Sequence, residues 1–157
     1  MEKAMSVAIY MADRYMKENG QAIDEMKLHK LMYFAQRESY IQTGFPLFDA
    51  TFYGWKYGPI IKEIRSAYRD GNILTATTNV VVEPNTINIV DKVFKDYAQK
   101  SSWSLSRLTH GELSWKNSRN GIAPEDNSDV PMREEDIKAD AKRIKDRRQM
   151  LAELGLA

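Results

Sequence analysis

The sequence predicts a mainly α-helical domain with a small β element, an α+β fold. We expect a compact helical body with a short hairpin and a C-terminal amphipathic helix. Apolar residues recur at helical spacing near both ends of the chain and in its middle. Two short stretches, FYGWKYGPI and NVVVEPNTINIV, have the composition of strands instead. The length of 157 residues suits one domain with a sizeable core.

The N-terminal third of the chain predicts two amphipathic helices. The first covers residues 2–19, and Gly20 is a suitable stop. Asp24 can cap the second helix, which runs through KLHKLMYFAQRESYIQ and is ended by Thr43-Gly44-Phe45-Pro46. The spacing of its apolar residues predicts one buried face. That face consists of Leu28, Leu31, Met32, Phe34 and Ala35.

Residues 52–60, FYGWKYGPI, predict a junction between a strand and a helix. In a strand, Tyr53, Trp55 and Tyr57 would share one face. Pro59 suits the first position of the following helix, where its missing N–H would have no partner. A short strand with one aromatic face most simply turns that face inward onto helices. The same aromatic residues would also suit a protein interface or base stacking.

The second half of the chain predicts one hairpin, several helices and a polar loop. We expect two short strands in residues 79–90, then a helix over residues 90–100. Two short helical pieces follow, separated by Gly111. Residues 118–131 are rich in Ser, Asn, Asp, Gly and Pro, which is typical of a loop. The last helix runs from there to about Glu153.

Composition and charge narrow the range of functions. The formal net charge is +1, so no overall field favours nucleic acid or a membrane surface. The absence of cysteine excludes disulfides, thiolate catalysis and cysteine-ligated zinc, and it suits a reducing compartment. Charged residues interrupt residues 1–20 before a signal peptide or membrane span could form. We therefore expect a cytoplasmic protein without membrane association.

The two histidines are the candidates for chemistry. His29 lies among lysines, and Glu25 is better explained by the dipole of its helix, so we predict no metal site. His110 follows a helical stretch and has Glu112 close by, so an enzyme would use His110 with Glu112 or with a nearby serine. His110 is suited to act as a general base near neutral pH, alternatively as a histidine that bonds the backbone or a tryptophan. No glycine-rich phosphate loop occurs, and we predict no cofactor.

The C-terminal helix begins acidic and turns basic, an order that complements the helix dipole. Its apolar stripe predicts packing on its own domain. The stripe consists of Ile137, Ala141, Ile144, Leu151 and Leu154. The basic residues beside the stripe leave docking of nucleic acid or protein as the alternative. They are Lys138, Lys142 and Lys145.

Three motifs in this order resemble the Panacea domain, the SocA-like antitoxin family that includes phage-associated proteins of the GepA type. They are KLHKLMYFAQ at residues 27–36, WKYGP at residues 55–59, and LSRLTH at residues 105–110 with Trp115 downstream. Their order and spacing match the family over residues 1 to about 140. The longer charged C-terminal helix departs from it. We therefore predict a Panacea-like antitoxin domain in residues 1–130, and a charged helix in residues 131–157 that packs on it or extends from it.

The resemblance implies an antitoxin, without enzymatic activity, that binds and neutralises a toxin encoded beside it in a bacterium or phage. In some members it implies an adaptor role that hands the toxin to a AAA+ protease. The predicted partner-binding residues are Tyr33, Gln36, Trp55, Lys56, Tyr57, Gly58, Pro59, His110 and Trp115. Tyr33, Gln36, Lys56, Tyr57 and His110 are expected to be exposed. The alternatives are a small hydrolase or transferase centred on His110 and a phage nucleic-acid accessory protein.

Overall fold

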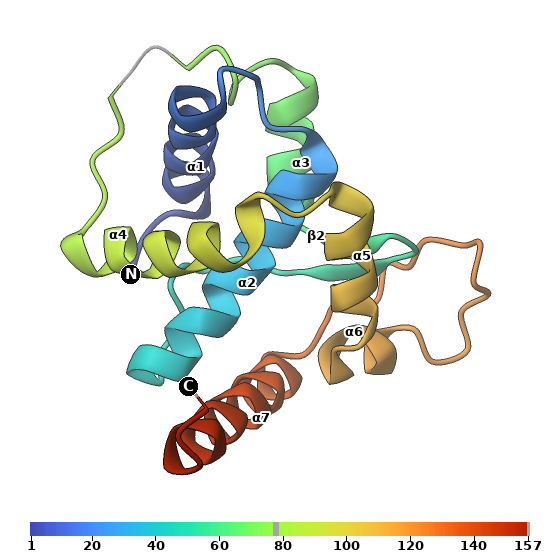
Figure 1. Cartoon of the computed structure of the whole chain (residues 1–157). Helices are drawn as coiled ribbons and strands as arrows, with labels where there is room; N and C mark the ends of the chain where they lie inside the picture. Colours follow the sequence, from blue (N-terminus) through green and yellow to red (C-terminus); the bar gives the residue numbers. More distant parts are fainter. Residues whose placement is uncertain (77–78, 157) are drawn as a thin grey trace.

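A computed structural model describes residues 1–76 and 79–156. Within these residues it has seven α-helices, one π-helical turn and a two-stranded antiparallel sheet, which confirms the predicted mainly helical fold with a small β element (Figure 1). The elements are α1 (Ala4–Asn19), α2 (Glu25–Thr43), β1 (Tyr53–Trp55), β2 (Gly58–Ile60), α3 (Lys62–Arg69), α4 (Pro84–Val93), η1 (Phe94–Ala98), α5 (Ser102–His110), α6 (Leu113–Ser118) and α7 (Glu134–Glu153).

Helix α2 is the central element, and the other helices surround it (Figure 1). The five apolar residues predicted to be buried are buried, and so is every other residue from Lys27 to Ile41, which means that burial extends around the whole helix. The polar side chains can be buried because they find partners inside the protein. The Gln36 amide, for example, donates to the Phe48 carbonyl at 2.9 Å and accepts from the Leu47 N–H at 2.9 Å.

The ends of the first two helices follow the local sequence signals. The Asp24 side chain accepts the Lys27 N–H at 2.8 Å, which confirms the predicted cap of α2. Gly20 and Gly44 end α1 and α2 with φ values of 69° and 80°. Glycine adopts this left-handed conformation without the steric cost of a side chain.

The predicted hairpin in residues 79–90 is wrong. Helix α4 begins at Pro84, and residues 79–83 are neither strand nor helix. A proline at the first helical position loses no hydrogen bond, and its fixed φ already suits a helix. The apolar residues then recur at helical spacing, and Ile89, Val90 and Val93 are buried.

The sheet forms instead from FYGWKYGPI. Strands β1 and β2 pair antiparallel, with Tyr53 opposite Ile60 and Trp55 opposite Gly58. Pro59 therefore lies in a strand, and α3 begins only at Lys62, so the expected helix start at Pro59 is wrong. A two-stranded sheet has an edge on each side, which is where a strand tolerates proline.

The last helices match the predicted pattern, with α5 and α6 separated at Gly111 and α7 ending at Glu153. A buried polar network fastens α7 to the body. The Tyr33 hydroxyl on α2 lies 2.9 Å from Glu112 and 3.3 Å from Asp140 of α7. Asp140 also accepts the Leu113 N–H at the start of α6, at 2.8 Å.

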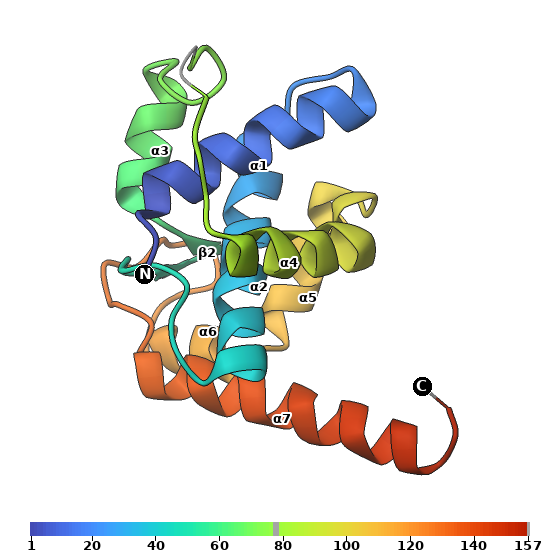
Figure 2. The same ribbon diagram turned by 90° about the vertical axis from the view of Figure 1, so that its left-hand side faces the viewer.

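The far end of α7 extends beyond the body (Figure 2). This end and the residues that follow it expose three apolar side chains, those of Met150, Leu154 and Leu156. The buried residues of α7 are Ile137, Asp140 and Ala141, all in its first half.

Candidate functional site

The hairpin places its glycine face against the helices. A β-carbon on Gly54 would lie 1.9 Å from the Ser118 hydroxyl oxygen. One on Gly58 would lie 2.5 Å from the Thr109 hydroxyl oxygen and 2.7 Å from Lys30 Cε. Gly58 also has a φ of +113°, which favours glycine. The backbone of the hairpin therefore approaches α2, α5 and α6 closely because these positions carry no side chain.

The aromatic side chains of β1 consequently lie on the other face. Tyr53 and Trp55 are only partly buried. The Lys62 ammonium lies 4.1 Å from the centre of the Tyr53 ring, and the Arg65 guanidinium lies 4.8 Å from that of Trp55. The predicted inward packing of the aromatic face is therefore wrong for α2, α5 and α6, which meet the glycine face, and the aromatic rings lie half-buried beside α3. Phe52, just before the strand, is buried in the core.

The turn of the hairpin presents an exposed aromatic pair. Tyr57 is 45% exposed, and its ring meets that of Trp103 edge-on, with 5.2 Å between centres and an angle of 87°. Trp103 is 56% exposed. The Tyr57 carbonyl accepts the Ser106 hydroxyl at 2.6 Å, and the Lys56 N–H donates to Asn127 at 3.1 Å. The turn is thus fixed by two hydrogen bonds from outside the hairpin.

Trp103 is the residue that sequence reasoning missed. Its signal was a tryptophan between serines at the start of a helix, SSWSLS. The serines there have structural tasks: Ser101 caps α5 by accepting the Ser104 N–H at 3.1 Å. A tryptophan in the first turn of a short helix, flanked by small polar residues, has few neighbours that could cover it.

His110 and Trp115 come together, as two motif residues predicted to act at one site. Their rings stack with 4.1 Å between centres and an angle of 14°. The Trp115 indole donates to the Trp55 carbonyl at 2.8 Å, which links α6 to the hairpin. Burial lowers the pKa of His110. The His110 Nε2 atom is buried and has no hydrogen-bond partner among the described residues.

The proposed pairing of His110 with Glu112 is wrong. Glu112 is buried and points to the network in the core, where the Arg37 guanidinium donates to it at 2.7 Å. Tyr33 and Arg143 are its other partners, at 2.9 and 3.2 Å. Burial raises the pKa of Glu112, while Arg37 opposes that shift. This carboxylate therefore balances a buried arginine.

Tyr33 and Gln36, expected at the surface, are also buried, with exposed fractions of 0% and 5%. Gly58 and Pro59 are buried as well. These four motif residues build the fold. The other five predicted residues, Trp115 included, remain at least partly exposed. Four of these, together with Trp103, lie around the turn, and we call them the hairpin surface. They are Trp55, Lys56, Tyr57, Trp103 and His110.

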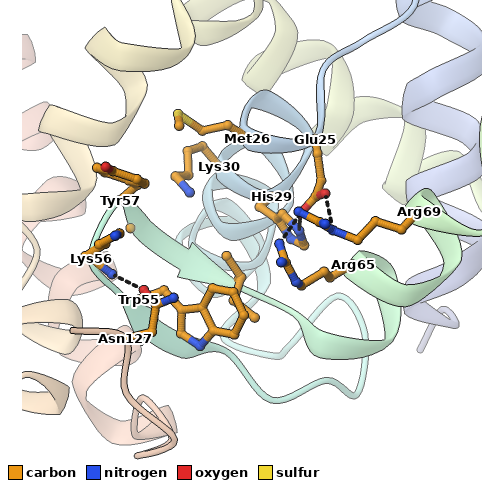
Figure 3. A pocket seen from close by; sticks show the side chains of 12 residues that line it. Glu25, Met26, His29, Lys30, Trp55, Lys56, Tyr57, Arg65, Arg69 and Asn127 are labelled. Atoms are coloured by element: carbon orange, nitrogen blue, oxygen red, sulfur yellow. Dashed lines mark hydrogen bonds and ion pairs between the residues drawn. The ribbon is translucent and has the colours of Figure 1, made fainter. Parts of the chain in front are cut away.

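Two hollows meet at the turn and share Lys56 and Tyr57 as lining residues. One is an open aromatic hollow of about 570 Å³, which also contains Trp103 and His110. The other, which we call the cationic pocket, has about 360 Å³ and lies between the hairpin, α2 and α3 (Figure 3).

The cationic pocket holds a cluster of charges around Glu25 (Figure 3). The Glu25 carboxylate lies 3.0 Å from Arg65, 3.1 Å from Arg69 and 3.3 Å from the His29 ring. Glu25 is therefore more than a first-turn acid that complements the helix dipole. The hydrogen bond from His29 and the two arginines lower its pKa, and burial lowers the pKa of His29.

Across residues 1–76 and 79–156, no group of three His, Asp or Glu side chains is arranged to hold a metal ion. In the same part of the chain, no helix combines the length and the apolar character needed to cross a bilayer.

Several basic residues of α7 form ion pairs with carboxylates. Lys142 pairs with Asp146 at 2.7 Å within the helix, and Arg148 pairs with the buried Glu38 of α2 at 3.0 Å. Such pairing offsets the positive charge that a phosphate backbone would need. The arrangement therefore favours a helix that lies on its own domain.

The fold and the site together define a small helical domain built around one buried helix, with an aromatic hairpin turn at its surface. A family model described as antitoxin SocA-like, Panacea domain, matches residues 28–116. The chain therefore belongs to the SocA-like antitoxin family with a Panacea domain. The matched region runs from α2 through the hairpin into α6, and contains all three motifs except Lys27, the first residue of the first motif. This membership supports an antitoxin-type role, for which the partner is in general a toxin.

The other two comparisons, with the curated proteins and with the solved structures, find no match.

Proposed function

We propose that this chain neutralises a toxin encoded by a neighbouring gene, and that it does so by binding the toxin directly through the hairpin surface. Family membership supports the antitoxin role. The exposed pair of Tyr57 and Trp103 is the observation that supports the hairpin surface as the binding site. Tyrosine and tryptophan dominate the energetics of protein interfaces, since they are large, rigid and amphipathic.

The hairpin surface is suited to this task because it is ordered before any partner arrives. Ser106 and Asn127 hold the turn from two different segments. The glycine face locks the strands against the helices, so the turn cannot shift freely. A preorganised surface loses little conformational entropy on binding, and more of the contact energy appears as affinity.

The mechanism in this proposal is occlusion of the active surface of the toxin. A standard interface takes about 800 Å² from each partner, more than the hairpin turn alone. Residues 1–130 would supply it, with the helix of residues 131–157 fastened beside them. The alternative is an adaptor role for a AAA+ protease, in which case the toxin would disappear from the cell instead of accumulating in a complex.

Co-expression with the adjacent open reading frame, followed by affinity purification, tests the proposal. The wild-type chain should retain the neighbouring gene product in a stable complex, and Trp103→Ala should weaken it by about 30-fold, as expected for loss of a binding hot spot. Phe45→Ala is the matched control, because Phe45 is an aromatic residue 72% exposed away from the hairpin. Failure of the wild-type chain to retain the neighbour would contradict the proposal.

The competing hypothesis is an enzyme centred on His110. The aromatic hollow supports it, because His110 lines this hollow and a small substrate could enter there. His110 lacks the Glu112 partner that this hypothesis relied on, and Ser106 is engaged by the Tyr57 carbonyl. A His110→Asn variant would separate the two. An enzyme should lose all protection from toxicity, because asparagine cannot act as a general base, whereas a binding protein should lose only the share of affinity that one residue of the hairpin surface contributes.

A further inference from the structure

Lys30 is a buried cation with too few partners. Its side chain is 1% exposed, and its ammonium makes one hydrogen bond in the described residues, to the Pro59 carbonyl at 3.4 Å. An ammonium carries three donors, and buried donors are normally satisfied. Its neighbour Lys27, by comparison, donates to the Ala98 carbonyl at 2.9 Å. Lys30 thus has donors to spare at the wall of the cationic pocket.

The fold makes room for this lysine. Any side chain at position 58 would collide with Lys30 Cε, and glycine there lets the lysine run past the hairpin. Figure 3 shows the amine between Tyr57 and His29, among the residues that line the pocket. The side chain therefore does not reach bulk water, where a lysine would otherwise place its charge.

The charges around the pocket have one dominant sign. Four cationic side chains line it, those of Lys30, Lys56, Arg65 and Arg69, against the single carboxylate of Glu25. Glu25 is held by Arg65 and Arg69 and not by Lys30. The pocket therefore already holds one carboxylate, and it retains a cation that this carboxylate leaves unpaired. A hydrogen bond between such an ammonium and an anionic oxygen would be charge-assisted, and charge-assisted hydrogen bonds are among the strongest in proteins.

We propose that the cationic pocket binds an oxyanion, a carboxylate or phosphate group, which accepts hydrogen bonds from Lys30 and is flanked by Arg65 and Lys56. Its volume of about 360 Å³ lies at the lower end of the range for small-ligand sites. Trp55 and Tyr57 supply aromatic walls for the rest of the ligand. The oxyanion comes either from a free small molecule or from an acidic side chain of the toxin, and the second source rests on the proposed function.

Binding of an oxyanion would change the protonation of Lys30. Burial lowers its pKa to about 7, while Glu25 and Asp24 act in the opposite direction. His29 faces the same pocket and adds no positive charge when neutral. An oxyanion within hydrogen-bond distance favours the charged amine, so its binding raises this pKa and strengthens as the pH falls toward 6.

The first test is an NMR titration of the purified full chain with sodium acetate, inorganic phosphate and adenosine monophosphate. The Lys30 side-chain signals should shift saturably with at least one of these probes, and the apparent pKa of Lys30 should rise by about one unit, a tenfold linkage. Lys30→Met and Arg65→Gln should each weaken binding by about tenfold or more. Lys145→Met, in the exposed part of α7, should leave it unchanged.

The probes also separate the two sources. Phosphate or the nucleotide binding in the micromolar range identifies a free small molecule. Saturable but millimolar binding of acetate, together with a toxin complex weakened at least tenfold by Lys30→Met, identifies an acidic side chain of the toxin. No saturable shift with any probe and an unchanged toxin complex would overturn the inference. If the wild-type chain forms no toxin complex, the proposed function fails, and the small-molecule titrations still decide this inference alone.

Discussion

The ring of Tyr57, at the turn of the hairpin, meets the ring of Trp103 on α5 edge-on at 5.2 Å, and both rings remain about half exposed. Two large aromatic side chains thus support each other without entering the core. Such a pair has its geometry fixed while about half of its surface is free for contact. We infer that the fold maintains it for a partner and not for stability.

Removal of either ring should therefore leave the domain folded. We expect Tyr57→Ala and Trp103→Ala to change the free energy of unfolding by about 1 kcal/mol or less, the range of an exposed aromatic pair. Urea denaturation followed by circular dichroism measures this change. A loss of several kcal/mol would instead assign the pair to the structural core.

Glu112 should be essential to the fold. Glu112→Ala would leave the buried Arg37 guanidinium without its carboxylate, and breaking a buried ion pair in this way costs about 3–5 kcal/mol. Urea denaturation of this variant should show the loss. Glu153→Ala, at the exposed end of α7, is the matched control and should stay within about 0.5 kcal/mol of wild type. Equal stability of the two variants would contradict the role of the network.

Lys30 should destabilise the domain that contains it. Its pKa falls from 10.5 in the unfolded chain to about 7 in the fold, so the unfolded state binds the extra proton between these values. Wild-type stability should therefore rise as the pH increases from 7 to 9.5. Lys30→Met should be more stable than wild type at pH 7, by about 1–4 kcal/mol, and the difference should shrink toward pH 9.5.

Chemical denaturation of both proteins at several pH values checks this prediction. A Lys30→Met variant that is less stable than wild type at every pH would show that the amine is satisfied in the fold. That result would also remove the main support for the oxyanion pocket.

Gly54 should not tolerate a side chain. The added β-carbon of Gly54→Ala would overlap the Ser118 hydroxyl, which then has to move and give up its 2.7 Å hydrogen bond to the Trp115 carbonyl. We expect a loss of about 1–3 kcal/mol, typical of overpacking. Ser118→Ala in the same chain should recover part of it, since the oxygen is the closest atom. A double-mutant cycle by thermal denaturation measures this coupling, and strict additivity would contradict the close approach.

Local sequence signals were sufficient to predict some ends of helices but not all of them. Asp24 and Gly44 marked the ends of α2 correctly, because capping depends on neighbours in the chain. The segment around Pro84 was predicted wrongly as a hairpin, because the run of β-branched residues before the proline resembled a strand. The proline itself begins a helix. Pro59 misled in the opposite sense, since Gly-Pro fits both a helix start and an edge strand.

The site was harder to predict than the fold. Tyr33 and Gln36 belong to a recognisable motif, yet whether a motif residue is exposed depends on which helices cover it. The full burial of α2 follows from contacts with helices far away in the sequence, α4, α5 and α7 among them. The partly paired state of Lys30 arises in the same way, from the hairpin that passes over it.

The decisive measurement is the growth of cells that express the adjacent open reading frame, with and without this chain. We expect the neighbour alone to arrest growth, the wild-type chain and Phe45→Ala to restore it, and Trp103→Ala to restore it poorly although the variant is folded. A harmless neighbour, or full rescue by a variant that lacks both Tyr57 and Trp103, would contradict the claim that this chain neutralises a toxin through its hairpin surface.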